Sequence, residues 1–477
     1  MKKLIHRFIN KFKIDNSFKF VTLTFLLMNI LSAYCLNAIR PYIHLVPSLV
    51  VGGILIIIGV LICILIVKNI KIAKILNVFL CILLIASSLL LTKFESYIAN
   101  VLNNQETETV YIVAKADSKL TKDDAFISLN LGMVKSDVLG NNFGLEILKN
   151  NNKSGFKSIE YKNYDESYKD LMSGKTDIMI VSTYGLSDLL DKYGDKYTSS
   201  IKILLKDSKK LSLIENKPVD INSTGFTMLV SGVDLTSDNI NEKGSSDVNI
   251  LVSVNPNTKR FVMQVVPRDM WTKLACASGH SKLTYAGAWG GVDCSIKSLE
   301  DYFDIDINYY AKINFKGVTD LVDALGGIDV ISDYEYCESG YCYKLGENHL
   351  DGDYALMFAR IRHVLPGGDV ARGKHQMEII NGVIKKFGAN PSYDNLTSLL
   401  STVESNFTTN FNKEDILKMY NLYTEMAPTL KIESYSIAGH TENAIDECTS
   451  EQLYYYYPDA GEKERVNKLI HDVVEGK

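Results

Sequence analysis

Hydrophobic residues are distributed very unevenly along this chain of 477 residues. Three long apolar runs fill most of the chain before Thr92, and beyond it shorter apolar patterns of strand and helix type alternate with polar turns. The three runs are Phe20–Ala38, Leu45–Val67 and Ile75–Leu91. Each is about as long as a helix that crosses the hydrocarbon core of a membrane. We therefore predict three transmembrane helices followed by soluble domains.

Basic residues beside these runs predict how the chain crosses the membrane. They precede the first run and fill the loop before the third, and they are Lys2, Lys3, Arg7, Lys11, Lys13, Lys68, Lys71 and Lys74. Short loops rich in lysine and arginine stay in the cytoplasm. A cleaved signal peptide is the alternative for the first run, but a second run follows it directly. We expect a multi-pass membrane protein with a cytoplasmic N-terminus, and with everything after about Glu95 outside the cell.

The soluble part divides into two predicted domains, residues 105–215 and 222–477, which follow an anchor at residues 1–94. In the first domain the pattern predicts two strands and two helices. These are the strands Val110–Ala116 and Asp177–Ser182 and the helices Ala125–Val134 and Tyr164–Met172. This small α/β domain contains no arginine and no histidine. We interpret it as an accessory domain.

The second soluble domain begins with the predicted strand Phe226–Ser231. A hairpin follows, in which Asp247–Val254 and Arg260–Val266 flank the turn sequence Asn255-Pro256-Asn257. The later pattern predicts strands at Asn308–Asn314 and Lys431–Ser436, and helices at Ser295–Phe303, Lys316–Leu325, Gly352–Ala359, Val370–Phe387 and Lys413–Glu425. Strands that alternate with helices in this way predict a sheet covered by helices.

Five of the eight cysteines lie in the soluble part, namely Cys276, Cys294, Cys337, Cys342 and Cys448. Disulfides persist outside the cell, and an odd number leaves at least one thiol unpaired within the chain. The sequence separations favour the pairs Cys276 with Cys294 and Cys337 with Cys342. The alternative is that all five are reduced. The cysteine spacing does not indicate a zinc site.

Arginine is rare in this chain, and its positions predict a phosphate site. The arginines are Arg7, Arg40, Arg260, Arg268, Arg360, Arg362, Arg372 and Arg465. A guanidinium grips phosphate oxygens with two parallel hydrogen bonds, which an ammonium cannot do. The formal net charge is −5, and the soluble part has no long basic block, so we do not expect nucleic acid as a direct ligand.

Several polar residues accompany these arginines at meaningful spacings. Arg360 and Arg362 point the same way if the chain there is extended. Asp369, Arg372 and Gln376 project from one side of the predicted helix. Asp234 and Asp247 lie at ends of strands that could be neighbours, and two such carboxylates suit a Mg²⁺ ion that bridges phosphates.

From about Phe226 to Lys386 the chain resembles the catalytic domain of the LytR-CpsA-Psr family of bacterial wall-polymer transferases. The shared motifs are Ser231-Gly232-Val233-Asp234, Ser246-Asp247, Pro267-Arg268-Asp269, Leu321-Val322-Asp323-Ala324-Leu325-Gly326-Gly327-Ile328, Leu350-Asp351-Gly352, Arg360-Ile361-Arg362, Asp369-Val370-Ala371-Arg372 and Gln376. The predicted anchor and accessory domain are similar to the capsule-attachment, CpsA-like branch.

The resemblance implies a fold, a cofactor and a role for each residue. The fold is an α-β-α sandwich with a central mixed sheet and an apolar tunnel for a polyprenyl tail. Asp234 and Asp247 are then the Mg²⁺ ligands. The implied pyrophosphate ligands are Arg268, Arg360, Arg362 and Gln376. The implied catalytic residues are Asp369, Arg372 and Arg268, with Asp369 as the base that activates an acceptor hydroxyl.

Two positions depart from the family pattern, because Ser245 and His375 stand where many members have arginine. We expect weaker phosphate binding, or compensation by Lys243, Lys273 and Lys374. His375 could titrate near neutral pH, although a single histidine on a helix is more often structural.

The resemblance implies a phosphotransferase that moves a polyprenyl-pyrophosphate-linked capsular or other wall polysaccharide onto peptidoglycan in a Gram-positive-type envelope. Capsule-assembly membrane proteins are further candidate partners. The alternatives are a lipid pyrophosphate hydrolase and a non-catalytic membrane sensor or regulator of capsule assembly. A DNA-binding role is disfavoured, since the predicted cytoplasmic part is too short for a recognition domain.

Overall fold

The computed structural model describes residues 71–210, 214–235, 239–362, 364–366, 368–389, 393–426 and 430–477, with Ile30, Ile57 and Leu61. These residues belong to two compact units, Met1–Ala99 with Lys413–Lys418 and Asn100–Asn412 with Met419–Lys477. The domain boundaries at 1–94, 105–215 and 222–477 stay a prediction.

The predicted membrane spans are not supported by the structure. Apart from three single residues, Phe20–Ala38 and Leu45–Val67 lie outside the described part of the chain. Ile75–Leu91 lies within α4 (Lys71–Asn103). Over the described residues, no helix combines the length and the hydropathy that crossing a membrane requires.

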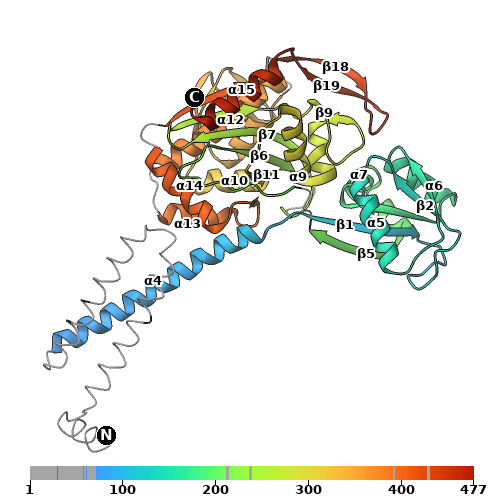
Figure 1. The fold of residues 1–477 in the computed structure, drawn as a ribbon, viewed down its shortest axis with the longest axis horizontal. Helices are drawn as coiled ribbons and strands as arrows, with labels where there is room; N and C mark the ends of the chain where they lie inside the picture. Colours follow the sequence, from blue (N-terminus) through green and yellow to red (C-terminus); the bar gives the residue numbers. More distant parts are fainter. Residues whose placement is uncertain are drawn as a thin grey trace, which may run out of the picture. The chain divides into compact units, whose positions relative to one another are not determined.

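A small α/β module follows α4 and is coloured from cyan through teal to green in Figure 1. Its strands are β1 (Thr107–Lys115), β2 (Asn130–Val134), β3 (Lys157–Tyr161), β4 (Ile178–Ser182) and β5 (Ile201–Lys210). They form one sheet in the order β3-β2-β4-β1-β5, with β3, β2 and β4 parallel and β1 antiparallel to both of its neighbours. The helices are α5 (Val138–Asn150), α6 (Tyr164–Ser173), α7 (Thr183–Tyr193) and α8 (Asp195–Ser200).

Both faces of this sheet are covered by helices. Ile178 and Ile180 of β4 pack with α5, while Met179 and Val181 pack with the other three helices. A strand that is buried on both faces has an unbroken apolar sequence rather than an alternating one. The predicted strands of the module and its helix Tyr164–Met172 are therefore confirmed as β1, β4 and α6.

The predicted helix Ala125–Val134 is wrong. Turns occupy its first half, and β2 occupies the second between β3 and β4. A short apolar run has no clear period, so periodicity alone does not separate a buried strand from a helix. Gly132 fits the strand, because a Cβ atom there would lie 2.6 Å from the Oγ of Ser167 on α6.

The larger domain is built on a mixed sheet of six strands. They are β6 (Phe226–Asp234), β7 (Ser245–Asn255), β8 (Arg260–Val265), β11 (Tyr309–Asn314), β16 (Phe407–Thr409) and β17 (Lys431–Ser436). The order is β16-β11-β6-β7-β8-β17. β11 runs parallel to β6 and β17 parallel to β8, and the other pairs are antiparallel. The expected mixed central sheet and the hairpin of β7 and β8 are confirmed.

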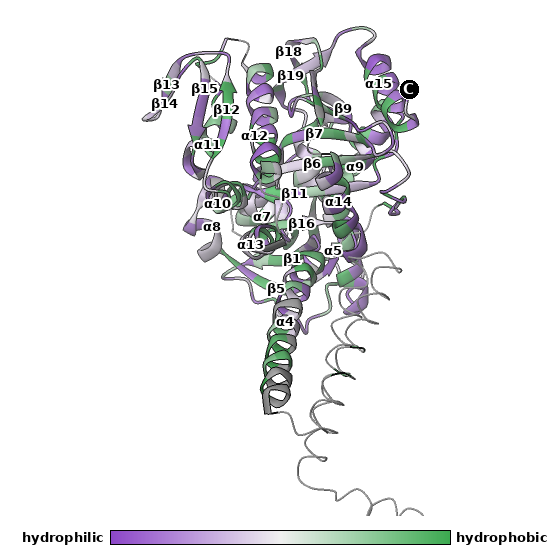
Figure 2. Ribbon diagram, turned by 90° about the vertical axis from the view of Figure 1, so that its left-hand side faces the viewer, coloured by the Kyte–Doolittle hydropathy of each residue, from purple (hydrophilic) through white to green (hydrophobic). Residues whose placement is uncertain are grey.

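Helices cover both faces of the six-stranded sheet (Figure 2). The helices of this domain are α9 (Leu283–Phe303), α10 (Phe315–Ala324), α11 (Gly352–Arg360), α12 (Asp369–Ala389), α13 (Tyr393–Val403), α14 (Lys413–Met426) and α15 (Glu462–Glu475). On one face Leu229 and Leu251 of the sheet form a buried core with Trp289 of α9 and Ile470 of α15. On the other face lie α10 and α12. The sandwich architecture is thereby confirmed.

This domain also contains short strands that form two-stranded sheets outside the six-stranded sheet. Their strands are β9 (Trp271–Lys273), β10 (His280–Lys282), β12 (Ile328–Ser332), β13 (Tyr336–Glu338), β14 (Tyr341–Tyr343), β15 (Gly346–Leu350), β18 (Gly439–Ile445) and β19 (Gln452–Pro458). The predicted helix Ser295–Phe303 is only the second half of α9. The first half was missed because Gly290 and Gly291 interrupt the helical pattern, and Gly291 has a φ of 72° at a kink.

Both predicted disulfides are present. Cys276, after β9, is bonded to Cys294 of α9, and Cys337 of β13 is bonded to Cys342 of β14. The remaining thiol, Cys448, is buried and unpaired. The prediction that residues 276–448 contain two disulfides and one free thiol is thereby confirmed.

Loss of the first disulfide is expected to destabilise the fold more than loss of the second. The bridged residues are 18 apart in the first pair and 5 apart in the second. A longer loop loses more entropy on closure in the unfolded chain. Replacing Cys276 and Cys294 with alanine should lower the free energy of unfolding by about 3 kcal/mol, against about 2 kcal/mol for Cys337 and Cys342. Urea unfolding of both double variants measures this, and the reverse order would contradict it.

Candidate active site

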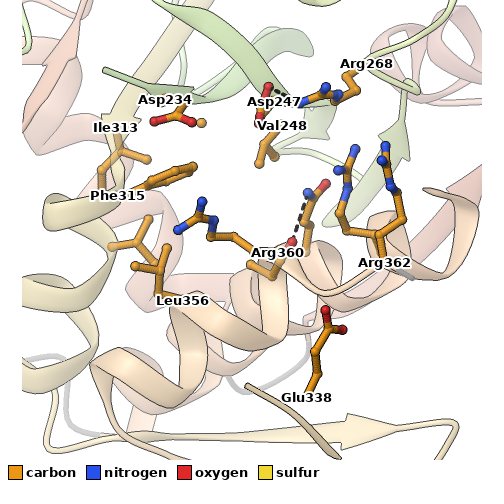
Figure 3. A pocket seen from close by; sticks show the side chains of 15 residues that line it. Asp234, Asp247, Val248, Arg268, Ile313, Phe315, Glu338, Leu356, Arg360 and Arg362 are labelled. Atoms are coloured by element: carbon orange, nitrogen blue, oxygen red, sulfur yellow. Dashed lines mark hydrogen bonds and ion pairs between the residues drawn. The ribbon is translucent and has the colours of Figure 1, made fainter. Parts of the chain in front are cut away.

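A cavity of about 320 Å³ lies between the sheet and the helices α10, α11 and α12. It is lined by Gly232, Asp234, Asp247, Val248, Arg268, Ile313, Phe315, Val318, Glu338, Leu356, Ala359, Arg360, Arg362, Arg372 and Gln376. In Figure 3 Asp234 and Asp247 lie on the sheet side of this cavity, and Arg360 and Arg362 extend from the other side. All predicted site residues except Asp369 therefore line one cavity, although they are up to 142 positions apart, from 234 to 376.

A β-bulge brings the two aspartates to the cavity. Gly232 of β6 pairs with Val248 of β7, but the next residue, Val233, pairs with Ser246. Asp247 is thus the extra residue of the bulge, while Asp234 ends β6. A bulge changes the direction of a side chain that regular pleating would fix. Asp247 accepts hydrogen bonds from Arg268 and from the hydroxyl of Thr284, whose oxygen lies 3.3 Å away.

Arg268 is held by carboxylates on two sides. Its Nη1 lies 2.6 Å from Oδ1 of Asp247, and its Nε lies 3.8 Å from Oδ1 of Asp269. Asp269 is almost fully buried and also contacts Lys282 at 2.8 Å and Arg362 at 3.9 Å. Burial lowers the pKa of Arg268, but the negative charges of Asp247 and Asp269 raise it by a larger amount, so the net shift is upward. The guanidinium therefore keeps its positive charge beside the cavity.

The first turns of α12 supply the third group of polar side chains. Asp369 begins the helix, and its Oδ1 lies 2.5 Å from Nη2 of Arg372, one turn later. The predicted helical spacing of Asp369, Arg372 and Gln376 is confirmed by their places on α12. Asp369 does not line the cavity itself but contacts it through Arg372.

Burial acts strongly on this pair. It raises the pKa of Asp369, which the charge of Arg372 opposes, and it lowers the pKa of Arg372. Within the described part of the chain, the Nε atoms of Arg268 and Arg372 are buried without a hydrogen-bond acceptor. Buried donors of this kind are costly unless a ligand or water satisfies them. Two guanidinium groups at the cavity wall therefore each keep one donor that the described residues do not satisfy.

Part of the cavity lining is apolar. It includes Ile313, Phe315, Val318 and Leu356. Arg360 stacks over the ring of Phe315, with its guanidinium carbon 4.5 Å from the ring centroid. Gln376 donates a hydrogen bond from Nε2 to the carbonyl of Ala359 at 3.3 Å, which joins α12 to the end of α11. A cavity lined by guanidinium groups and by apolar side chains suits an anionic head group on a hydrocarbon chain.

The donor set also fits a Mg²⁺ ion. Among the described residues, no group of three or more His, Cys, Asp and Glu side chains is placed to hold a metal. Mg²⁺, however, is commonly bound through one or two carboxylates, with phosphate oxygens and water completing its shell. Asp234 and Asp247, on neighbouring strands and on the same cavity, meet this lower requirement.

The sequence did not point to two further charged residues at this site. Glu338 lines the cavity, and one of its carboxylate oxygens is buried without a hydrogen-bond partner among the described residues. Its place in a hairpin closed by the Cys337–Cys342 disulfide is the only local signal that could have found it. Lys282 contacts Asp269 from β10, which no sequence spacing indicates.

The structure explains one of the two departures from the family pattern. His375 is buried away from the cavity, with its ring 3.9 Å from the ring of Phe358 and its Nδ1 3.1 Å from the carbonyl of that residue. Burial lowers its pKa to about 4, below the neutral range, which agrees with the structural role that the sequence favoured for His375. Ser245 lies opposite Asp234 in the sheet.

The three lysines suggested as compensation lie elsewhere in the domain. None of the three lysines lines the cavity. Lys243 is buried and donates to the carbonyl of Trp289, and Lys374 lies 3.4 Å from Asp333 at the surface. Lys273 belongs to β9. Their positions follow from packing elsewhere in the domain, which the sequence does not reveal.

The buried His375 is expected to make stability fall in mild acid. Its folded pKa is lowered to about 4 from the ordinary 6.5, so the unfolded chain takes up the proton first. The contribution of neutral His375 to the free energy of unfolding is therefore fully present above pH 6.5. It declines as the pH falls towards 4, by on the order of 3 kcal/mol. Denaturant unfolding at pH 7 and pH 4.5 measures this decline. It should be clearly smaller in His375→Leu, and an equal decline in both proteins would contradict the assignment.

Comparison with known proteins identifies the family. Residues 193–471, more than half of the chain, match the LytR_cpsA_psr family. The chain is 34% identical over 247 residues to the polyisoprenyl-teichoic acid–peptidoglycan teichoic acid transferase TagU of Bacillus cereus (strain AH820), covering 52% of this chain and 78% of that protein. A protein of the same name from Enterococcus faecalis (strain ATCC 700802 / V583) is 30% identical over 224 residues, covering 47% and 74%.

Among solved structures, TagV of B. subtilis is 27% identical and matches with a TM-score of 0.46, covering 53% of this chain and 98% of that one. The family match extends over every residue of the cavity described above. This chain belongs to the LytR-CpsA-Psr family.

Proposed function

We propose that this protein transfers a polyprenyl-pyrophosphate-linked glycan to peptidoglycan, with a capsular or another wall polysaccharide as the polymer. One observation carries the proposal. Four of the eight arginines in the chain line the same cavity, whose lining also includes the apolar side chains of Ile313, Phe315, Val318 and Leu356. The names of the relatives, which describe transfer of a polyisoprenyl-linked polymer to peptidoglycan, support this reading.

In the proposed reaction the arginines hold the pyrophosphate. Arg268, Arg360, Arg362 and Arg372 offer planar donor pairs that match phosphate oxygens. Gln376 adds an amide donor. The apolar residues beside Phe315 accept the first isoprene units of the lipid. The reacting phosphorus is thereby held in a partly dry site, where fixed positive charge stabilises the transition state most strongly.

The transfer exchanges one P–O bond for another. An acceptor hydroxyl oxygen of peptidoglycan attacks the phosphorus that carries the glycan, and polyprenyl phosphate leaves. The acceptor hydroxyl enters beside Arg372, where Asp369 adjoins the cavity without lining it, and Asp369 takes the hydroxyl proton. Burial raises the pKa of this carboxylate, which makes it a stronger base. Arg372 orients that carboxylate and faces the charge that grows on the phosphate oxygens.

Asp234 and Asp247 are the proposed holders of Mg²⁺. The ion would neutralise pyrophosphate charge at the sheet side of the cavity, opposite Arg360 and Arg362. The chain's own contribution is the bulge that directs Asp247 into the cavity and the contact with Arg268 that fixes its side chain.

An outward-facing, membrane-anchored position is also part of the proposal. It rests on the three apolar runs before Thr92, on the basic residues beside them and on the two disulfides of the larger domain. Lipid-linked substrate and peptidoglycan meet on that side of the membrane.

The test is a transfer assay with purified full-length protein, a lipid-linked glycan and peptidoglycan fragments. Formation of a glycan–peptidoglycan product that depends on Arg372 supports the transferase. Release of free glycan phosphate with no wall-linked product would point to the hydrolase instead. Normal polymer attachment in cells that carry Asp369→Ala or Arg372→Ala at normal protein levels would favour the non-catalytic regulator.

A further inference from the structure

We infer that Glu106 and Glu108, which belong to the small α/β module, are positioning residues for the active site of the larger domain. They are separated from that site by more than 120 positions, and neither lines the cavity. Through two buried lysines they hold the chain segment 239–244, which enters β7 directly before Asp247 and packs against the backbone of Asp234 at Gly244. The inference rests on the function proposed above.

Lys312 is the first of the two lysines. It lies on β11, its side chain is fully buried, and its ammonium forms an ion pair with Glu106, which is also buried. The same ammonium donates hydrogen bonds to the carbonyls of Ile240 at 3.0 Å and Glu242 at 2.8 Å. One buried cation thus joins the module to two carbonyls of segment 239–244. A buried ammonium needs a carboxylate partner, so removal of the Glu106 charge disturbs the whole group.

Glu106 makes a second contact with the larger domain. Its other carboxylate oxygen accepts a hydrogen bond from the backbone N–H of Val292 at 2.7 Å, directly after the kink of α9 at Gly291. The next residue, Thr107, donates its backbone N–H to the carbonyl of Asn241 at 2.9 Å. Segment 239–244 is therefore held by the module through backbone as well as side-chain contacts.

Lys243 is the second lysine and lies within the segment itself. Its side chain is fully buried, pairs with Glu108 and donates to the carbonyl of Trp289 at 2.8 Å. Burial raises the pKa of Glu108, and the charge of Lys243 opposes that rise. In the structure, then, each of the two buried lysines has its charged partner on β1 or directly before it.

The position of segment 239–244 affects both cavity aspartates, because the chain is closely packed around Gly244. A Cβ atom on Gly244 would lie 2.5 Å from the backbone oxygen of Asp234, and one on Gly287 of α9 would lie 2.7 Å from the backbone oxygen of Gly244. Asp247 follows only three residues after Gly244, in the bulge. A shift of the segment therefore moves the ends of β6 and β7, and a misplacement of about 1 Å can cost roughly 100-fold in rate.

The test compares Glu106→Gln and Glu108→Gln with a matched control in full-length protein. The control is Glu146→Gln, because Glu146 lies in the same module but forms an exposed ion pair with Lys209. The first measurement is hydrogen exchange of the amides of residues 239–247. The second is kcat and KM for transfer of the lipid-linked glycan. The third is binding of inorganic pyrophosphate.

We expect faster exchange at 239–247 and a fall in kcat of roughly 10- to 100-fold in both variants, with a smaller change in KM. The control should match the wild type. A double variant, Glu106→Gln with Lys312→Met, removes both buried charges and should fold, yet kcat should stay low because a thioether side chain donates no hydrogen bond to the segment. Recovery of wild-type kcat in the double variant would show that Glu106 acts on stability alone and would overturn the inference.

Unchanged exchange and unchanged kcat in the single variants would overturn it as well. A wild-type protein without transfer activity would instead refute the proposed function. In that case hydrogen exchange and pyrophosphate binding still decide whether the module positions the site.

Discussion

Replacing Arg372 with alanine is expected to lower kcat/KM for glycan transfer by about 1,000-fold, the effect of removing one fixed charge from a phosphoryl-transfer site. Arg372 is buried, lines the cavity, and carries an Nε donor for which the described residues provide no acceptor. Its guanidinium pairs with Asp369 but is not fully satisfied by the described residues. Arg372→Lys should recover little of the loss, since an ammonium does not form the paired hydrogen bonds.

The matched control for this prediction is Arg260→Ala. Arg260 likewise has a carboxylate partner, Glu433 at 2.8 Å, but it is only partly buried and lies outside the cavity. Its replacement should leave kcat/KM within about twofold, since surface ion pairs contribute little. The kcat/KM values and the unfolding curves of the two alanine variants are measured side by side. Equal activity would show that Arg372 has no part in the reaction.

Replacing Asp369 with asparagine is expected to lower kcat/KM by roughly 100- to 10,000-fold, the usual contribution of a general base. Burial raises the pKa of Asp369 above that of an ordinary aspartate. The base acts only when ionised, so the rate of the wild type should fall as the pH falls through this raised pKa. The acidic limb of the pH profile should therefore lie above pH 3.8 and be absent from the residual activity of Asp369→Asn.

Asp333→Asn is the control for the pH profile. Asp333 contacts Lys374 of α12, but both side chains are more than half exposed and neither lines the cavity. Its replacement should leave both the rate and the acidic limb unchanged. An acidic limb that persists in Asp369→Asn would assign the base to another group. The candidate is then Glu338, because it is the carboxylate of the cavity lining that is not a proposed metal ligand.

Much of the fold was predictable because its signals are local. The turn Asn255-Pro256-Asn257 predicts the hairpin of β7 and β8 from three residues. The helical spacing of Asp369, Arg372 and Gln376 needs only the start of α12. Local signals failed where packing decides between alternatives. The apolar run before Val134 became a strand because β3 and β4 flank it. The structural role that the sequence favoured for His375 agrees with its packing against Phe358.

The sequence by itself determined which groups could do the chemistry. Scarce arginines near aspartates indicate phosphate binding wherever the chain places them, because a guanidinium has the same donors in any fold. The two disulfides likewise followed from separation along the chain. Only the tertiary structure decided that Arg268, Arg360, Arg362 and Arg372 share one cavity with an apolar wall. It also decided that Asp247 occupies a bulge and that Lys312 pairs with Glu106, 206 positions away. Contacts of this kind depend on strand order and on packing between elements, and no local pattern of residues encodes either of them.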